Sequence, residues 1–220
     1  MTVRALVVAK APVPGLAKTR LAADVGYAAA ADLAAAALLD TLDACWAAFP
    51  DGCHLALAGD LADSARRSEI RAALRGWQVF AQEGDTLGDR LANAHAAVGR
   101  RPGPLVQVGM DTPQATVRLL RDAARRLRPG AGVVGPAVDG GWWLLGLADP
   151  SAARAVANVP MSTNRTGEDT CASLEAHGVR VRLGATLRDV DTVEDAEVVA
   201  RVAPRTRFAA AWRLLRPEAA

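Results

Sequence analysis

VRALVVA, residues 3–9, leads directly into KAPVPGLAKTRL, residues 10–21, and this stretch decides the fold. The first part is a short apolar run with β-branched residues, which predicts a buried strand that ends at the prolines of the loop. Lys10, Lys18 and Arg20 then gather in a turn that opens a helix. Clustered cations at a helix N-terminus predict a site for an anionic group, most often phosphate. An ordinary surface turn has a similar composition, but the density of cations beside Gly15 favours phosphate.

The loop is neither of the two common phosphate-binding motifs. A P-loop requires G-x-x-x-x-G-K-[ST], and Pro12 and Ala17 stand where its two glycines belong. A dinucleotide-binding fingerprint is excluded because no G-x-G-x-x-G follows the first strand. The residues of this segment that we expect at the phosphate are Lys10, Pro14, Gly15, Lys18, Thr19 and Arg20.

Composition limits the remaining possibilities. The chain has 220 residues, 51% of them hydrophobic, which suits one well-buried domain. A formal net charge of +2 gives no support for nucleic-acid binding. The three cysteines have no metal-ligand spacing, the N-terminus has no signal-peptide pattern, and Asp32 interrupts the alanine-rich stretch. These features predict a cytoplasmic protein without a membrane span.

Strand and helix patterns alternate along the rest of the chain. We expect further strands at 53–58, 77–81, 104–108, 133–134, 142–147 and 179–183. We expect helices at 27–49, 64–74, 116–127, 151–158 and 168–177, with Ser64 as the cap of the second. A further helix follows residues 82–89 and ends at 98, and the last begins at about 192. This alternation predicts a single α/β domain over residues 1–220, built around a mostly parallel sheet.

Asp111 is the first carboxylate that this architecture selects. It directly follows an apolar strand, and ligands of open α/β sheets bind beyond the carboxyl ends of the strands. An Asp there can hold Mg²⁺ or Mn²⁺ together with phosphate oxygens, although it could instead cap the helix near 116. Side chains of an extended segment alternate between its two sides, so Asp189 and Asp191 lie on the same side. Both therefore face the site, or both miss it. Capping of the final helix near Thr192 is the alternative for this segment.

A third acidic position is Asp139, followed by Gly140 and Gly141 just before the strand 142–147. Two glycines after an Asp are common in a hairpin turn. They would also let backbone amides approach a sugar or an acceptor, with Trp142 as a flat wall. The sequence favours neither interpretation over the other.

Motifs along nearly the whole chain carry a resemblance to a known bacterial family. They are KAPVPG (10–15), KTRL (18–21), GD (84–85), LGDRL (87–91), GMDTP (109–113), GPA (135–137), DGG (139–141), LLGL (144–147), ST (162–163) and DVDTVED (189–195). With them the chain resembles the radical-SAM/selenodomain-associated transferase 1 family, within the nucleotide-diphospho-sugar transferase superfamily. The resemblance implies a GT-A fold, a Rossmann-like three-layer α/β/α sandwich with a nucleotide at the strand carboxyl ends. Trp142-Trp143 and Met161 depart from the family pattern, so the resemblance does not imply the acceptor.

The resemblance also implies roles for individual residues. It implies Mg²⁺ or Mn²⁺ held by Asp111, with Asp191 as the partner and Asp189 in reserve. Gly88, Asp89 and Gly109 are expected to join the basic loop at the nucleotide. The expected acceptor- or sugar-binding residues are Thr112, Asp139, Gly140, Gly141, Trp142, Ser162 and Thr163.

Two reactions fit these expectations. In nucleotidyl transfer a phosphorylated small molecule attacks the α-phosphorus of an NTP and pyrophosphate leaves, with Lys18, Arg20 and Asp111 as the catalytic residues. In glycosyl transfer an NDP-sugar is the donor, and a carboxylate such as Asp139 is the base. The clustered cations favour nucleotidyl transfer, because a triphosphate needs more positive charge than a metal-bound diphosphate. A nucleotide-binding module without catalysis is the third possibility.

The C-terminal region is rich in helical pattern. Phe208, Trp212 and Leu215 share one face of a predicted helix. That face is expected to pack either on the domain or on a second subunit, which would make a homodimer.

Overall fold

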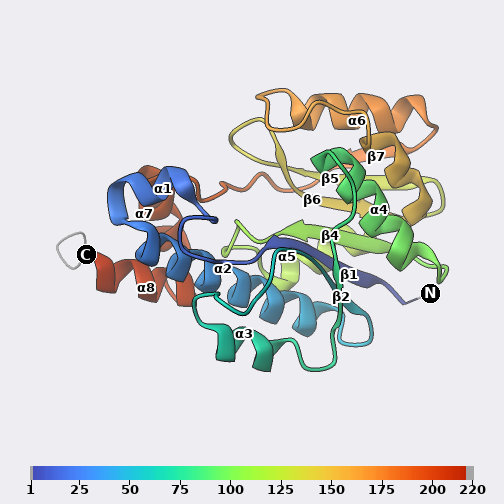
Figure 1. The fold of residues 1–220 in the computed structure, drawn as a ribbon. Helices are drawn as coiled ribbons and strands as arrows, with labels where there is room; N and C mark the ends of the chain where they lie inside the picture. Colours follow the sequence, from blue (N-terminus) through green and yellow to red (C-terminus); the bar gives the residue numbers. More distant parts are fainter. Residues whose placement is uncertain (1, 217–220) are drawn as a thin grey trace.

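The structure is a computed structural model, and it describes residues 2–216 (Figure 1). Strands and helices alternate, as the hydrophobic pattern predicts. In chain order the elements are β1 (Arg4–Lys10), α1 (Thr19–Val25), α2 (Tyr27–Ala48), β2 (Cys53–Ala58), α3 (Arg67–Ala73), β3 (Gln78–Ala81), α4 (Leu87–Gly99), β4 (Leu105–Gly109), α5 (Val117–Arg125), β5 (Ala131–Pro136), β6 (Trp142–Leu147), the 3₁₀ helix η1 (Pro150–Val156), α6 (Thr166–Ala176), β7 (Arg180–Leu183), α7 (Val193–Val202) and α8 (Arg207–Leu215).

The sheet has seven strands in the order β3-β2-β1-β4-β6-β5-β7. β1 pairs in parallel with both β2 and β4, so Val7 lies between Leu55 and Val108. Within residues 2–216, β6 is the one strand that runs antiparallel to its neighbours β4 and β5. The prediction of a mostly parallel sheet is confirmed. Because β6 begins where β5 ends, the turn between them lies at the same edge as the carboxyl ends of β1 and β4.

Helices cover both faces of the sheet, which gives the expected three layers. Figure 1 shows α2 and α3 on one side, and α4 and α6 on the other. The larger core cluster packs the first face against α2 and α5 through residues such as Val7, Leu38 and Leu120. Smaller clusters fill the space under α4, η1 and α6. No helix within residues 2–216 is long and apolar enough to cross a membrane.

Two helix starts differ from the sequence expectations. Ser64 does not cap α3, because its backbone N–H closes a turn on Leu61 and the helix begins three residues later, after Arg66 in a left-handed conformation. The expected helix at 151–158 is instead a 3₁₀ helix, and the side chain of Asp149 accepts a hydrogen bond from the Ser151 amide at its start.

The last two helices pack on the domain. Phe208 and Trp212 of α8 are buried in a cluster with Leu33 and Ala37 of α2. The backbone amides of Arg207 and Phe208 both donate to the Asp40 carboxylate at 3.0 Å, which fixes the start of α8 on α2. Leu215, the third residue of the predicted face, is exposed.

Candidate active site

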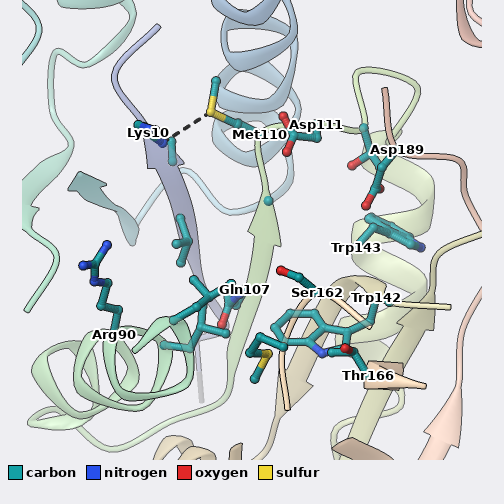
Figure 2. A pocket seen from close by; sticks show the side chains of 18 of the residues that line it. Lys10, Arg90, Gln107, Met110, Asp111, Trp142, Trp143, Ser162, Thr166 and Asp189 are labelled. Carbon is teal, nitrogen blue, oxygen red and sulfur yellow. Dashed lines mark hydrogen bonds between the residues drawn. The ribbon is translucent and has the colours of Figure 1, made fainter. Parts of the chain in front are cut away.

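Two adjoining cavities lie at the carboxyl edge of the sheet. The main cavity, of about 420 Å³, runs from the ends of β1 and β2 across β4 to the start of β6. The second cavity, of about 230 Å³, lies under the basic loop. Lys10, Met110 and Asp111 line both, so the two cavities meet where β1 and β4 end. Figure 2 shows the main cavity with the backbone N–H of Lys10 bonded to the Met110 sulfur.

Lys18 joins the basic loop to the carboxylates. Its backbone is left-handed, with φ at 50°, and its side chain is only 9% exposed. The ammonium lies 2.8 Å from Asp111 Oδ1 and 2.9 Å from Asp191 Oδ1. Burial opposes the charged form of Lys18, but the two carboxylates outweigh burial and raise its pKa. Lys18 is therefore a buried cation that already has two anionic partners.

The rest of the basic loop is more open. Arg20 is 79% exposed and its guanidinium lies 3.4 Å from Asp191 Oδ2. Lys10 is exposed at the end of β1 and lines both cavities, and Thr19 lines the second. Pro14 and Gly15 line neither cavity, and Gly15 supplies the positive φ of 82° that turns the loop.

The carboxylates of Asp111, Asp139, Asp189 and Asp191 lie close together, and the one Lys18 ammonium does not balance their negative charge. Figure 2 shows Asp111 and Asp189 at the same end of the main cavity. Asp189 Oδ1 is buried and has no hydrogen-bond partner among residues 2–216. Burial and the charges of Asp111 and Asp139 raise the pKa of Asp189 to about 7, and Asp191 adds to this while Lys18 opposes it.

Asp111, Asp189 and Asp191 are the residues that would hold the expected divalent cation. In the described part of the chain, no group of three or more His, Cys, Asp or Glu side chains could hold a metal ion by itself. Mg²⁺ and Mn²⁺ commonly take only one or two protein carboxylates and complete their shell with water and phosphate oxygens. The Lys18 ammonium already lies between Asp111 and Asp191. Asp189 Oδ1, which has no hydrogen-bond partner among residues 2–216, can accept a bond to a further cation.

The opposite wall of the main cavity comes from the β5–β6 turn and the loop before α6. Asp139, Gly141, Trp142, Ser162 and Thr163 all line it. Ser162 has a φ of 61°, which a residue with a side chain rarely adopts, and such strain is frequent at binding sites.

The turn at 139–141 is the hairpin turn that the sequence allowed. Gly140 lines neither the main nor the second cavity. A Cβ on Gly140 would lie 2.1 Å from the Asn164 carbonyl, so this glycine permits close packing of the two loops. Gly141, by contrast, does reach the cavity, and its amide donates to Asp139 Oδ1 at 2.9 Å. The hairpin interpretation is confirmed, and the approach of a backbone amide to a sugar or an acceptor stays a prediction.

At the start of α4, Gly88 and Asp89, which were expected at the nucleotide, lie outside both cavities. Asp89 and Thr86 form a capping box, in which each side chain accepts the other residue's backbone N–H. Gly88 lies against the carbonyls of Val156 and Ala157, where a Cβ would not fit. Neither Gly88 nor Asp89 lines either of the two cavities, whereas Gly109 and Thr112 line the main one.

Sequence reasoning missed four polar residues of the main cavity, Gln82, Arg90, Gln107 and Thr166. Arg90 lies on the α4 side, and its Nε donates to the Gly84 carbonyl. Gln82 donates to the carbonyls of Ala9 and Ala56 from the end of β3. Gln107 lies in the middle of β4 and lines the cavity. The signal for Gln107 was present, because a polar residue inside an apolar strand requires a partner.

A model of the DUF2064 family, described as an uncharacterized protein conserved in bacteria, matches residues 41–163, which is more than half of the chain. The chain belongs to the DUF2064 family. The narrower radical-SAM-associated family named above stays a prediction. A comparison with curated proteins found no match.

Solved structures with the same fold include transferases. A protein from Desulfovibrio desulfuricans G20, provisionally named a nucleotide-diphospho-sugar transferase, is 27% identical, with a TM-score of 0.85 over 99% of this chain and 98% of that one. A cytidylyltransferase from Leptospira borgpetersenii is 12% identical, with a TM-score of 0.58 over 99% of this chain and 94% of that one.

A third solved structure contains a metal. Rv0371c from Mycobacterium tuberculosis, in complex with manganese, is 23% identical, with a TM-score of 0.50 over 90% of this chain and 98% of that one. The DUF2064 chain thus shares its fold with nucleotide-diphospho-sugar transferases and cytidylyltransferases, which agrees with the superfamily expected from its motifs.

Proposed function

We propose that this protein is a metal-dependent glycosyltransferase that moves the sugar of an NDP-sugar to a hydroxyl group of a small acceptor. The observation that carries the proposal is the division of charge in the main cavity. Figure 2 shows Lys10 and Arg90 on one side, and Asp189, Trp142 and Ser162 on the other. A cationic side suits the diphosphate of the donor, and a side with carboxylates and an aromatic ring suits hydroxylated groups.

The charges of the basic loop no longer favour a triphosphate. The sequence alone favoured nucleotidyl transfer because three cations looked available. In the structure Lys18 is bound by two carboxylates and Arg20 lies beside one of them. Among residues 2–216, Lys10 is the member of this trio that has no carboxylate partner. A phosphorylated acceptor would also meet Asp139 and Asp189, which repel it.

The proposed reaction uses groups that line the cavity. Asp139, oriented by the Gly141 amide, takes the proton of the acceptor hydroxyl as that oxygen bonds to the anomeric carbon of the sugar. The bond from the anomeric carbon to the phosphate oxygen breaks, and the NDP leaves with the bonding electrons. Lys10 and Arg90, on the cationic side of the main cavity, stabilise the charge on the leaving diphosphate. Asp111 and Asp191, with Asp189, would hold the Mg²⁺ or Mn²⁺ ion, which neutralises diphosphate charge when bound.

A product assay separates the two reactions. The protein is incubated with Mn²⁺ and either UDP-glucose, GDP-mannose, dTDP-glucose and ADP-glucose or the four NTPs, with glycerol and glycerol 3-phosphate as model acceptors. ³¹P NMR then distinguishes a released NDP from pyrophosphate. We expect NDP from one sugar nucleotide with a hydroxyl acceptor, and at least a tenfold lower rate for Asp139→Asn. Pyrophosphate from an NTP, without NDP from any sugar nucleotide, contradicts the proposal.

Nucleotidyl transfer from an NTP remains the second candidate, and one observation favours it. The second cavity is lined by Lys10, Lys18, Thr19 and Arg20 and opens beside the main cavity. A leaving pyrophosphate would fit there if the Lys18 ammonium turned from the carboxylates to the phosphates. In that case Lys18→Met would abolish the stabilisation of the protein by NTP.

A further inference from the structure

Gln107 is an amide buried at the floor of the main cavity. It lies in β4 between Val106 and Val108, opposite Leu145 of β6, and is only 2% exposed. Figure 2 shows it below the carboxylates, between Arg90 and Ser162. A buried amide is costly unless its N–H and C=O groups have partners. The floor of the cavity therefore contains a polar group that requires an explanation.

His95 fixes one end of this amide. The imidazole is fully buried on α4, and its Nε2 lies 2.8 Å from Gln107 Oε1. Burial lowers the pKa of His95 to about 4, so the ring is neutral. Its Nδ1 is buried without a hydrogen-bond partner among residues 2–216.

The neutral ring has one N–H, and its position follows from this contact. A buried N–H without a partner is rarer than a buried acceptor without one, so the proton lies on Nε2 and is donated to Gln107 Oε1. The amide nitrogen of Gln107 is then turned away from His95. It has no hydrogen-bond partner among the described residues, and Gln107 lines the cavity.

The surroundings of this donor define what it would bind. The neighbouring cavity walls are Val8, Leu91 and Trp142, which belong to one apolar cluster. An N–H donor without charge, next to a flat aromatic side chain, suits an uncharged hydroxylated ring. The end of the cavity at Ala58 and Gln82 lies two strands away, beyond β1, and is left for the nucleoside.

We propose that the Gln107 amide donates a hydrogen bond to an oxygen of the sugar of an NDP-sugar and thereby determines which sugar is accepted. Gln107 is a specificity residue, and His95 is the positioning residue that keeps the amide nitrogen toward the cavity. This inference rests on the proposed glycosyltransferase function. It assigns the floor of the cavity to a neutral sugar.

Calorimetric titration tests the contact. Dissociation constants are measured in Mn²⁺ for UDP-glucose, GDP-mannose, dTDP-glucose and ADP-glucose, and for UDP, GDP, dTDP and ADP. For the preferred donor, we expect Gln107→Leu to reduce the affinity gained from the sugar about tenfold and to leave NDP affinity unchanged. Gln78→Leu makes the same change at an exposed position of β3 and is expected to alter neither affinity.

Two outcomes of the titration have different meanings. If wild-type protein binds an NDP-sugar more tightly than the NDP, and Gln107→Leu keeps that difference, the assignment of Gln107 is wrong while the proposed function stands. If none of the four sugar nucleotides binds more tightly than its NDP, the assignment of Gln107 is wrong, and the product assay alone decides the proposed function.

NMR of wild-type protein tests the assignment without relying on a folded variant. With ¹⁵N-labelled glutamine, the side-chain NH₂ signals of Gln107 are expected to shift with the NDP-sugar and not with the NDP. The same spectra of His95→Phe are expected to show a weaker shift, and the affinity gained from the sugar is expected to fall several-fold. Gln107 signals that respond equally to the NDP and the NDP-sugar would overturn the inference.

Discussion

Lys18 shows how the role of a single residue depends on its partners. Its position beside Thr19 and Arg20 predicted a phosphate contact. In the structure its ammonium instead lies between Asp111 and Asp191, the two predicted metal ligands. The sequence identified all of these residues but could not show the contact, because Lys18 and Asp191 are 173 positions apart.

The first prediction concerns removal of this cation. Lys18→Met leaves Asp111, Asp189 and Asp191 repelling one another, so we expect a loss of about 2 kcal/mol of stability in EDTA. Mn²⁺ should restore more stability to this variant than it adds to wild-type protein, because the metal no longer competes with the ammonium. Thermal unfolding with EDTA and with Mn²⁺ measures both effects. Arg20→Met, which removes an exposed partner, is the control. Equal Mn²⁺ stabilisation of wild type and Lys18→Met would show that the ion binds elsewhere.

The second prediction concerns pH and His95. Its folded-state pKa of about 4 lies below the ordinary value of 6.5, so between these values the unfolded chain binds a proton that the folded chain does not. Stability from this group is present above about pH 6.5 and is lost toward pH 4, by at most about 3 kcal/mol.

Asp189, whose pKa is raised to about 7 by burial and by neighbouring carboxylates, acts in the opposite direction across this range. Comparison with His95→Phe therefore isolates the histidine. Urea unfolding is measured for both proteins between about pH 7 and about pH 4.5. The stability of wild type relative to the variant should fall with pH. A constant difference would mean that His95 is not buried in the neutral form.

At the scale of elements, two helices begin with the same device. Thr86 with Asp89 and Thr192 with Asp195 are both capping boxes. The sequence analysis recognised the second and assigned Asp89 of the first to the nucleotide through a resemblance. The same four-residue pattern, Thr-x-x-Asp, caps a helix in both places. Only the packing around each helix shows whether a candidate ligand site is near. The central strands were easier to predict, because their apolar runs lie between clear turn residues.

The two capping boxes provide the third prediction. Thr86→Ala and Thr192→Ala should each cost about 1 kcal/mol of stability, because each removes the acceptor of one helix N–H. Only the second should also weaken Mn²⁺ binding, since Asp195 accepts the Asp191 amide as well. Urea unfolding and calorimetric titration of Mn²⁺ measure the two quantities. Equal Mn²⁺ affinities for both variants would show that the cap of α7 does not hold Asp191 in place for the metal.

At the scale of the whole molecule, the fold was predictable and the composition of the site was predictable only in part. Alternating strands and helices indicate the layers, and the rule that ligands bind at strand carboxyl ends selected Asp111. Gln107 and Arg90 were missed because their significance arises from the walls opposite them, which come from distant segments. The direction of β6 also depends on packing, since an apolar run does not show which way a strand runs.

A second core cluster connects the parts of the site, and Trp212 lies in it. The cluster joins Leu21 of α1, Val190 between Asp189 and Asp191, and Phe208 of α8. It thus fixes the basic loop relative to Asp191, although Trp212 itself touches neither cavity.

The last prediction tests this connection. Trp212→Ala removes a side chain that is 3% exposed, so we expect a loss of about 3 kcal/mol. We also expect several-fold weaker Mn²⁺ binding, because Val190, and with it Asp191, is no longer held beside Asp111. Leu214→Ala, on the exposed side of the same helix, is the matched control and should change stability by less than about 0.5 kcal/mol. Urea unfolding and Mn²⁺ titration at a temperature where both variants are folded distinguish the effects. A destabilised Trp212→Ala with unchanged Mn²⁺ affinity would show that the C-terminal helix stabilises the domain without organising its site.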